Sequence, residues 1–169
     1  MKYLSHLHWA IPVVLVGAVL WQVFVSTTPL TGTTNFVTPT PYFDVLLPAS
    51  RVSRSPAGLA LLTEPVYVDV RLPLRVASVE LELTTTADSA ALRLGVQQGK
   101  DFAIVFPDVA AVKSDQGQSY RLKVTDFSFL RPRHTLRFVL SAPGLKARSI
   151  QVTGASVRFE RAPFGWNSL

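Results

Sequence analysis

Beyond residue 42 the chain alternates apolar and polar residues with a period of two, and this pattern restricts the folds available to it. In PVYVDVRL, Val66, Val68 and Val70 fall on one face, while Tyr67 and Asp69 fall on the other. The same alternation recurs in VASVELELT, ALRLGVQ, SYRLKVTDF and TLRFVLSA. Successive side chains of a β-strand point to opposite faces, so these segments predict strands with one buried and one wet face.

These segments and three shorter apolar runs predict about eight or nine strands. The shorter runs are FDVLL, GLALL and FAIVF, and turn-forming residues separate the strands, as in SRSPAG, QQGKD and KSDQGQ. Short strands at this spacing predict a β-sandwich, and eight strands in two sheets is the jelly-roll number. We therefore expect an all-β, jelly-roll-like sandwich over residues 42–162, with an immunoglobulin-like sandwich as the alternative.

Two local features refine this expectation. Pro65 and Pro73 bracket the VYVDVRL segment. Proline cannot donate a backbone hydrogen bond to a neighbouring strand, so we expect this strand either at the edge of a sheet or with sharp turns at its two ends. In SIQVTGASVRFER the apolar residues change parity across Gly154, which predicts a β-bulge there.

The N-terminal region contains an uncharged apolar segment, WAIPVVLVGAVLWQVFV, at residues 9–25. As an α-helix it would rise about 25 Å, and lengthening at both ends would bring it near the ~30 Å hydrocarbon core of a bilayer. Trp9 and Trp21 have rings that favour membrane interfaces, and Pro12 lies near the helix start, where a missing N–H costs least. We therefore predict a single transmembrane helix over residues 9–28.

The flanks of this segment predict its orientation. Lys2 precedes it, and no charge follows it until Asp44. The positive-inside bias then places a stub of residues 1–8 in the cytoplasm and the C-terminal domain outside it. The alternative is a cleaved signal peptide and a secreted protein, although the best local cleavage site, after Thr27, is poor.

Two further segments flank the predicted domain. Residues 29–41 are rich in Thr and Pro, which predicts an extended spacer between membrane and domain. Residues 163–169 form a short tail whose Phe164 and Trp166 could dock on a partner. With Tyr67, which faces outward by parity, these two aromatic residues are the candidate contacts to a partner or ligand.

The composition excludes several kinds of site. The chain has no cysteine, so disulfides, thiolate nucleophiles and cysteine zinc sites are excluded. Seventeen Lys and Arg against eleven Asp and Glu give a net charge of +6, but no basic run occurs. We therefore expect no nucleic-acid partner. The sequence also contains no phosphate-binding loop, dinucleotide fingerprint or G-x-S-x-G motif.

The titratable residues do not form a recognisable catalytic pattern. His134 is the only histidine beyond the N-terminal region, and we interpret it as a surface or turn residue. Glu80 and Glu82 lie about 7 Å apart on one strand face, a tolerable separation for glycosidase carboxylates. Their place in an alternating segment indicates an ordinary exposed face instead. We expect no enzymatic activity and no cofactor.

The closing segment, RHTLRFVLSAPGLKARSIQVTGASVRFERAP, resembles the last strands of galactose-binding-like and carbohydrate-binding-module jelly rolls. EPVYVDVRLP followed by VASVELEL resembles the early strands of the same class. The resemblance covers about half of the domain and implies a sandwich whose loops or concave face bind sugars, with a structural calcium in some relatives. Asp108, Asp115 and Asp126 could offer oxygen ligands, but their spacing matches no calcium loop. Sugar platforms use exposed aromatic rings, and Trp166 is the only tryptophan beyond the apolar segment.

Two functional hypotheses follow. The first is a non-catalytic, membrane-anchored extracytoplasmic sandwich that acts as a structural or assembly subunit and docks on envelope proteins. The alternative is a glycan-binding module displayed at the cell surface. The first is favoured by an apolar anchor and aromatic tail without a catalytic pattern, and the second by the jelly-roll resemblance.

Overall fold

The structure is a computed structural model that describes residues 7–21, 27–38, 40–44, 46–55, 58–86, 92–98, 101, 103–114, 117–127, 130–131, 134–143 and 150–162. The helices in this part of the chain are α1 (Leu7–Leu20) and a short 3-10 helix, η2 (Ala49–Arg51). The strands are β1 (Leu30–Thr34), β2 (Val52–Ser55), β3 (Gly58–Leu61), β4 (Val66–Arg71), β5 (Val76–Thr85), β6 (Arg93–Gln97), β7 (Ile104–Val105), β8 (Val112–Ser114), β9 (Gly117–Val124), β10 (Thr135–Ser141) and β11 (Ile150–Arg161).

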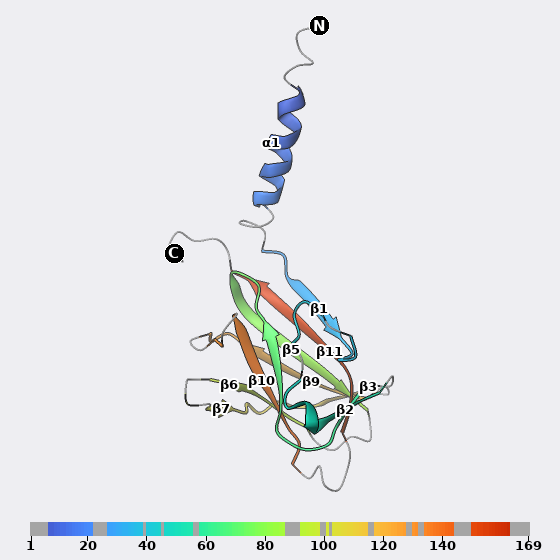
Figure 1. Cartoon of the computed structure of the whole chain (residues 1–169). Helices are drawn as coiled ribbons and strands as arrows, with labels where there is room; N and C mark the ends of the chain where they lie inside the picture. Colours follow the sequence, from blue (N-terminus) through green and yellow to red (C-terminus); the bar gives the residue numbers. More distant parts are fainter. Residues whose placement is uncertain are drawn as a thin grey trace.

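The strands form two antiparallel sheets that pack as a β-sandwich (Figure 1). The large sheet has the order β2-β3-β11-β5-β9-β8, and β1 pairs with β11 beside this path. The small sheet has the order β4-β10-β6-β7. The predicted all-β sandwich is confirmed, and the arrangement is compatible with a jelly-roll-like fold. The described strands number eleven rather than eight or nine, because short strands such as β1, β2 and β8 lack a clear alternating pattern.

The core between the sheets is built from the apolar residues of the alternating segments. Val68 of β4, Leu81 of β5 and Phe138 of β10 are completely buried. Burial of a side chain of this size contributes about 1.5–3 kcal/mol relative to leaving it in water. The long strands therefore bury the face that the alternation predicts.

The two local predictions about strand geometry are confirmed. β4 lies at one edge of the small sheet, next to β10. The pairing of β11 with β5 shifts register between Val152 and Gly154. This shift lets apolar residues of opposite parity, such as Val152 and Val157, face the same core.

Two short segments differ from the sequence prediction. The predicted spacer of residues 29–41 contains β1, which pairs with β11, and Phe36, which is only 8% exposed in the core. Threonine-rich sequence suits a strand when a free edge is available, and β11 offers that edge. FDVLL, predicted as a strand, makes only isolated bridges, from Phe43 to Val70 and from Leu47 to Tyr67.

Helix α1 is shorter than the predicted transmembrane helix of residues 9–28. It has 14 residues and would rise about 21 Å, against a bilayer core of ~30 Å. Among the described residues, no helix combines the length and the apolar character needed to cross a membrane. Residues 22–26 of the predicted span lie outside the described residues.

A mostly buried ion pair joins β4 to β10. Arg137 donates from Nε and Nη2 to the two carboxylate oxygens of Asp69, each at 2.6 Å. Their side chains are only 11% and 12% exposed. These hydrogen bonds raise the pKa of Arg137. The guanidinium of Arg137 also lies 4.9 Å from the ring centre of Tyr67.

We expect Asp69→Leu to lower the free energy of unfolding by about 3 kcal/mol, because the guanidinium of Arg137 would stay nearly buried without its counter-ion. The double variant Asp69→Leu/Arg137→Met should recover most of that loss. Urea unfolding of the full chain, followed by circular dichroism, measures both. A double variant as unstable as the single one would show that the loss of stability does not come mainly from the unpaired guanidinium of Arg137.

Candidate functional site

The segment of residues 35–46, which we call the crossing segment, carries the chain from the large sheet to the small one. It starts in a tight turn after β1. Thr34 Oγ1 accepts from the amide of Phe36 at 2.9 Å, and Asn35 Oδ1 accepts from the amide of Val37 at 3.0 Å. Short polar side chains stabilise turns in this way. The turn holds Phe36 at a φ of 61° and directs its ring into the core, edge-on to Phe43.

The second half of the crossing segment is fixed to both sheets. Tyr42 packs against Phe159 of β11, with ring centres 5.0 Å apart, and lies over Gly32 of β1. The backbone carbonyl of Tyr42 accepts from the amide of Arg71 at 2.8 Å. The amide of Asp44 donates to the backbone carbonyl of Asp69 at 2.9 Å. These contacts hold the second half of the crossing segment in place against both sheets, at one side of the sandwich.

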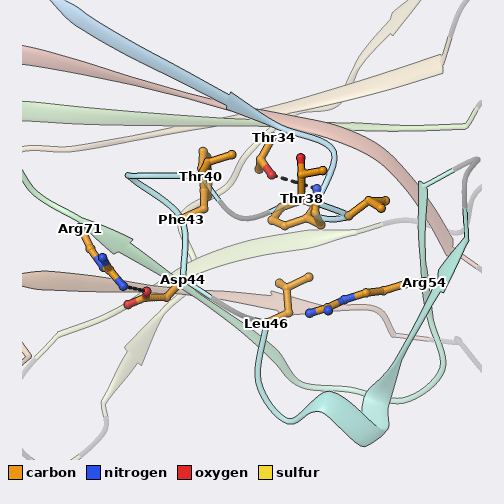
Figure 2. A pocket seen from close by; sticks show the side chains of 10 residues that line it. Thr34, Thr38, Thr40, Phe43, Asp44, Leu46, Arg54 and Arg71 are labelled. Atoms are coloured by element: carbon orange, nitrogen blue, oxygen red, sulfur yellow. Dashed lines mark hydrogen bonds and ion pairs between the residues drawn. The ribbon is translucent and has the colours of Figure 1, made fainter.

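A pocket of about 290 Å³ lies where the crossing segment meets β2 and β4 (Figure 2). Its described apolar lining comes from Phe36, Val37, Phe43 and Leu46. Three of these four side chains are nearly buried, and Val37 is 43% exposed at the rim. The polar lining comes from Thr34, Thr38, Thr40, Asp44, Arg54 and Arg71.

The two arginines of the pocket differ in their charge balance. Arg71 donates to the carboxylate of Asp44, and this hydrogen bond raises the pKa of Arg71. Arg54 comes from β2 and extends toward Leu46 in Figure 2. Its exposed guanidinium has no hydrogen bond or ion pair with the described residues. Arg54 is therefore the uncompensated cation of the described lining.

Thr40 adds a polar group that lacks a partner. Its Oγ1 is shielded from solvent, yet it has no hydrogen bond in the described structure. Buried hydroxyls are normally paired, so an unpaired one in a pocket wall indicates a place where a ligand atom could bind. Together with Arg54, it gives the pocket two unused hydrogen-bond donors above an apolar floor.

The described lining of the pocket contains few titratable groups. Asp44, the one carboxylate of the described lining, is paired with Arg71, and the described lining contains no histidine. Over the described ranges, no group of three or more His, Asp or Glu could hold a metal ion. The pocket thus offers a cation, hydroxyls and apolar contacts to a ligand.

The residues predicted from sequence lie elsewhere. Tyr67 is half-buried under Arg137, and its backbone is hydrogen-bonded to Leu47 in both directions. Phe164 and Trp166 lie outside the described residues, so their roles stay predictions.

The predicted anchor residues belong to the N-terminal region. Trp9 and Pro12 are part of α1, and Trp21 follows the helix with 64% of its surface exposed. The structure therefore places none of the described predicted contacts in the pocket.

The other titratable candidates have structural settings. Glu80 and Glu82 both pair with Arg121, at 3.2 and 3.1 Å. His134 is an exposed turn residue with a φ of 53°. Of the three aspartates weighed as calcium ligands, Asp115 lies outside the described residues.

Sequence reasoning missed the pocket because its residues come from three separate segments. Arg54 lies in a short strand without alternation, and the crossing segment reads as a spacer. One signal was present: TTNFVT places an apolar aromatic residue between turn-forming residues, a pattern typical of a turn that inserts a side chain into a core.

A scan against protein-family models and a search of curated proteins found no match to this sequence.

We expect Gly32→Val to displace Tyr42 and loosen the crossing segment. A Cβ at Gly32 would lie 2.5 Å from Cδ2 of the Tyr42 ring. Overpacking of this kind costs about 1–3 kcal/mol, so the amides of Asp44 and Arg71 should exchange hydrogen roughly tenfold faster. Exchange measured by NMR or mass spectrometry tests this.

Gly154→Ala is the matched control, because its added Cβ would meet its nearest atom at 3.7 Å. Unchanged exchange in Gly32→Val would mean that Tyr42 does not hold the crossing segment in place.

Proposed function

We propose that this protein is a non-catalytic, membrane-anchored docking subunit whose pocket under the crossing segment binds an acidic and apolar segment of an envelope partner protein. The observation that carries the proposal is the unpaired guanidinium of Arg54 above an apolar floor. A carboxylate of the partner would pair with Arg54, and an adjacent apolar side chain would contact Val37 at the rim of the pocket.

The anchoring part of the proposal is supported by the character of α1. Its side chains from Ile11 to Leu20 include seven large hydrophobic residues that are 49–68% exposed. The helix extends away from the sandwich in Figure 1. A helix that is apolar on all sides requires an apolar surrounding, and the lipid bilayer supplies one. We propose that residues 9–28 anchor the chain, with its N-terminus in the cytoplasm and its sandwich outside.

A protein partner fits the pocket better than a neutral sugar does. Carbohydrate platforms present the open face of an aromatic ring, but Phe36 and Phe43 are only 8% and 6% exposed. The most exposed apolar residue of the lining is Val37, which suits contact with another apolar side chain.

An acidic glycan is the second candidate. The hydroxyls of Thr38 and Thr40 line the same pocket as Arg54, and together these groups could bind a sugar carboxylate and its neighbouring hydroxyl groups. A sandwich compatible with a jelly-roll-like fold agrees with the resemblance to carbohydrate-binding modules. This candidate predicts binding to acidic polysaccharide without any protein partner.

We expect Arg54→Gln to weaken partner binding by about tenfold or more, because hydrogen bonds to charged groups contribute about 1.5–3 kcal/mol. A photo-reactive residue at Val37 would crosslink the partner in native membranes, and the yield would fall in Arg54→Gln.

Arg158→Gln, which removes an exposed arginine from β11, is the matched control and should leave the yield unchanged. Equal losses in both variants would argue against a role for the pocket. Retention on an acidic polysaccharide, lost only in Arg54→Gln, would favour the glycan candidate.

We expect Val16→Arg to weaken membrane association, because a charge in the middle of the apolar segment costs about 2.5–3.5 kcal/mol on insertion scales. Flotation of expressed protein with native membranes, combined with intact-mass measurement, tests this. Ser53→Arg, on an exposed position of β2, is the control. A mass lacking residues 1–27 in the native protein would instead identify a cleaved signal peptide.

A further inference from the structure

One end of the sandwich, which we call the β1 end, gathers several chain connections. Leu30, at the start of β1, pairs with Phe159 near the end of β11. Arg71, at the end of β4, pairs with Thr135 at the start of β10. The β4–β5 turn (residues 72–75) and the β9–β10 connection therefore both cross between the sheets at this end, which is the end nearer α1 in Figure 1.

The two connections enclose an apolar groove of about 230 Å³. Its described apolar lining includes Leu72, Leu74, Val76, Phe127 and Leu130. All of these except Leu74 pack partly against the core. Leu74 is 76% exposed, more than any other large hydrophobic residue in the described part of the chain. An exposed leucine at the rim of an apolar groove is a feature of surfaces that contact a partner or membrane.

The turn that presents Leu74 is firmly held. The amide of Leu72 donates to the carbonyl of His134 at 2.9 Å, and the amide of Ala162 donates to the carbonyl of Arg75 at 2.7 Å. Both sheets therefore fix the turn, and Leu74 is displayed at a constant position on the β1 end.

Basic residues surround the groove. Arg75 and His134 belong to its lining, Arg131 bridges to Thr135 beside it, and Arg161 ends β11 next to it. Against these three arginines, the described part of the β9–β10 connection contributes one carboxylate, from Asp126.

On the outer face of the large sheet, Glu160 pairs with Lys123 at 2.9 Å, whereas Glu80 and Glu82 share Arg121 at 3.2 and 3.1 Å. Around the groove itself, arginines outnumber carboxylates among the described residues. The β1 end therefore has a basic character that complements an anionic surface.

The chain geometry keeps this end close to α1. Nine residue steps separate Trp21, just after the helix, from Leu30 at the start of β1. A fully extended chain of that length reaches at most about 32 Å. A helix anchored in the bilayer therefore holds the β1 end within this distance of the interface.

We propose that the β1 end docks on the membrane surface, with Leu74 inserted at the headgroup boundary and the surrounding arginines on anionic phospholipid headgroups. This inference rests on the proposed membrane anchor. The tether turns docking into an intramolecular event at high effective concentration, so one leucine and a few arginines are enough. Attraction between arginines and anionic lipid falls off within about 10 Å at 0.1 M salt, so docking should weaken as salt rises.

Because the chain has no cysteine, Leu74→Cys can be labelled singly with an environment-sensitive fluorophore. The full chain would be placed in anionic vesicles of phosphatidylcholine with about 30% phosphatidylglycerol, and in neutral vesicles of phosphatidylcholine alone. We expect blue-shifted emission and quenching by brominated lipid in the anionic vesicles. Leu62→Cys is the matched control, since Leu62 is a 54% exposed leucine that follows β3 at the opposite end.

Arg75→Gln in the labelled chain tests the electrostatic part. One arginine near an anionic surface should change the ratio of docked to undocked sandwich by about fivefold. Arg93→Gln, an exposed arginine near the far end of β10, should leave the ratio unchanged.

Flotation of the same vesicles separates the two levels of the proposal. A chain that floats while Leu74→Cys and Leu62→Cys report equal water exposure overturns the docking surface and keeps the anchor. A chain that does not float overturns both. Shielding of position 74 in native membranes but not in protein-free vesicles would overturn lipid docking and assign the β1 end to a protein partner.

Discussion

Strand β11 is the element on which the rest of the structure depends. One of its edges pairs with β5 along almost its whole length, and the opposite edge is shared by β3 near its start and β1 near its end. The shared edge leaves β1 and the β2–β3 hairpin next to each other without pairing. The crossing segment departs from this place, and the pocket forms there because Thr34 and Arg54 are brought to its two sides. A sheet with a single continuous strand at this edge would have no room for the pocket.

The sequence predicts the sandwich well because its long strands have one strong physical requirement. Each alternating segment must bury one face, and a shift of one residue would expose all of its apolar side chains. The β-bulge is predictable for the same reason, since Val152 and Val157 can share a core only across an irregularity near Gly154. These are local consequences of burial and need no knowledge of which strands are neighbours.

The pocket and β1 were not predictable, because they depend on pairing between distant segments. β1 is a strand because β11 offers a free edge, and nothing in LTGTT itself requires it. Arg54 and the crossing segment meet only after both sheets have formed.

The two proposed surfaces share no lining residue, so both can be occupied at the same time. With the β1 end against the headgroups, the pocket would keep one orientation relative to the membrane, and a neighbouring envelope protein would meet it in that orientation. Without that docking, only the covalent link to α1 would relate the sandwich to the membrane. Docking through Leu74 and its arginines would therefore raise the share of productive encounters at Arg54 without adding any contact to the partner.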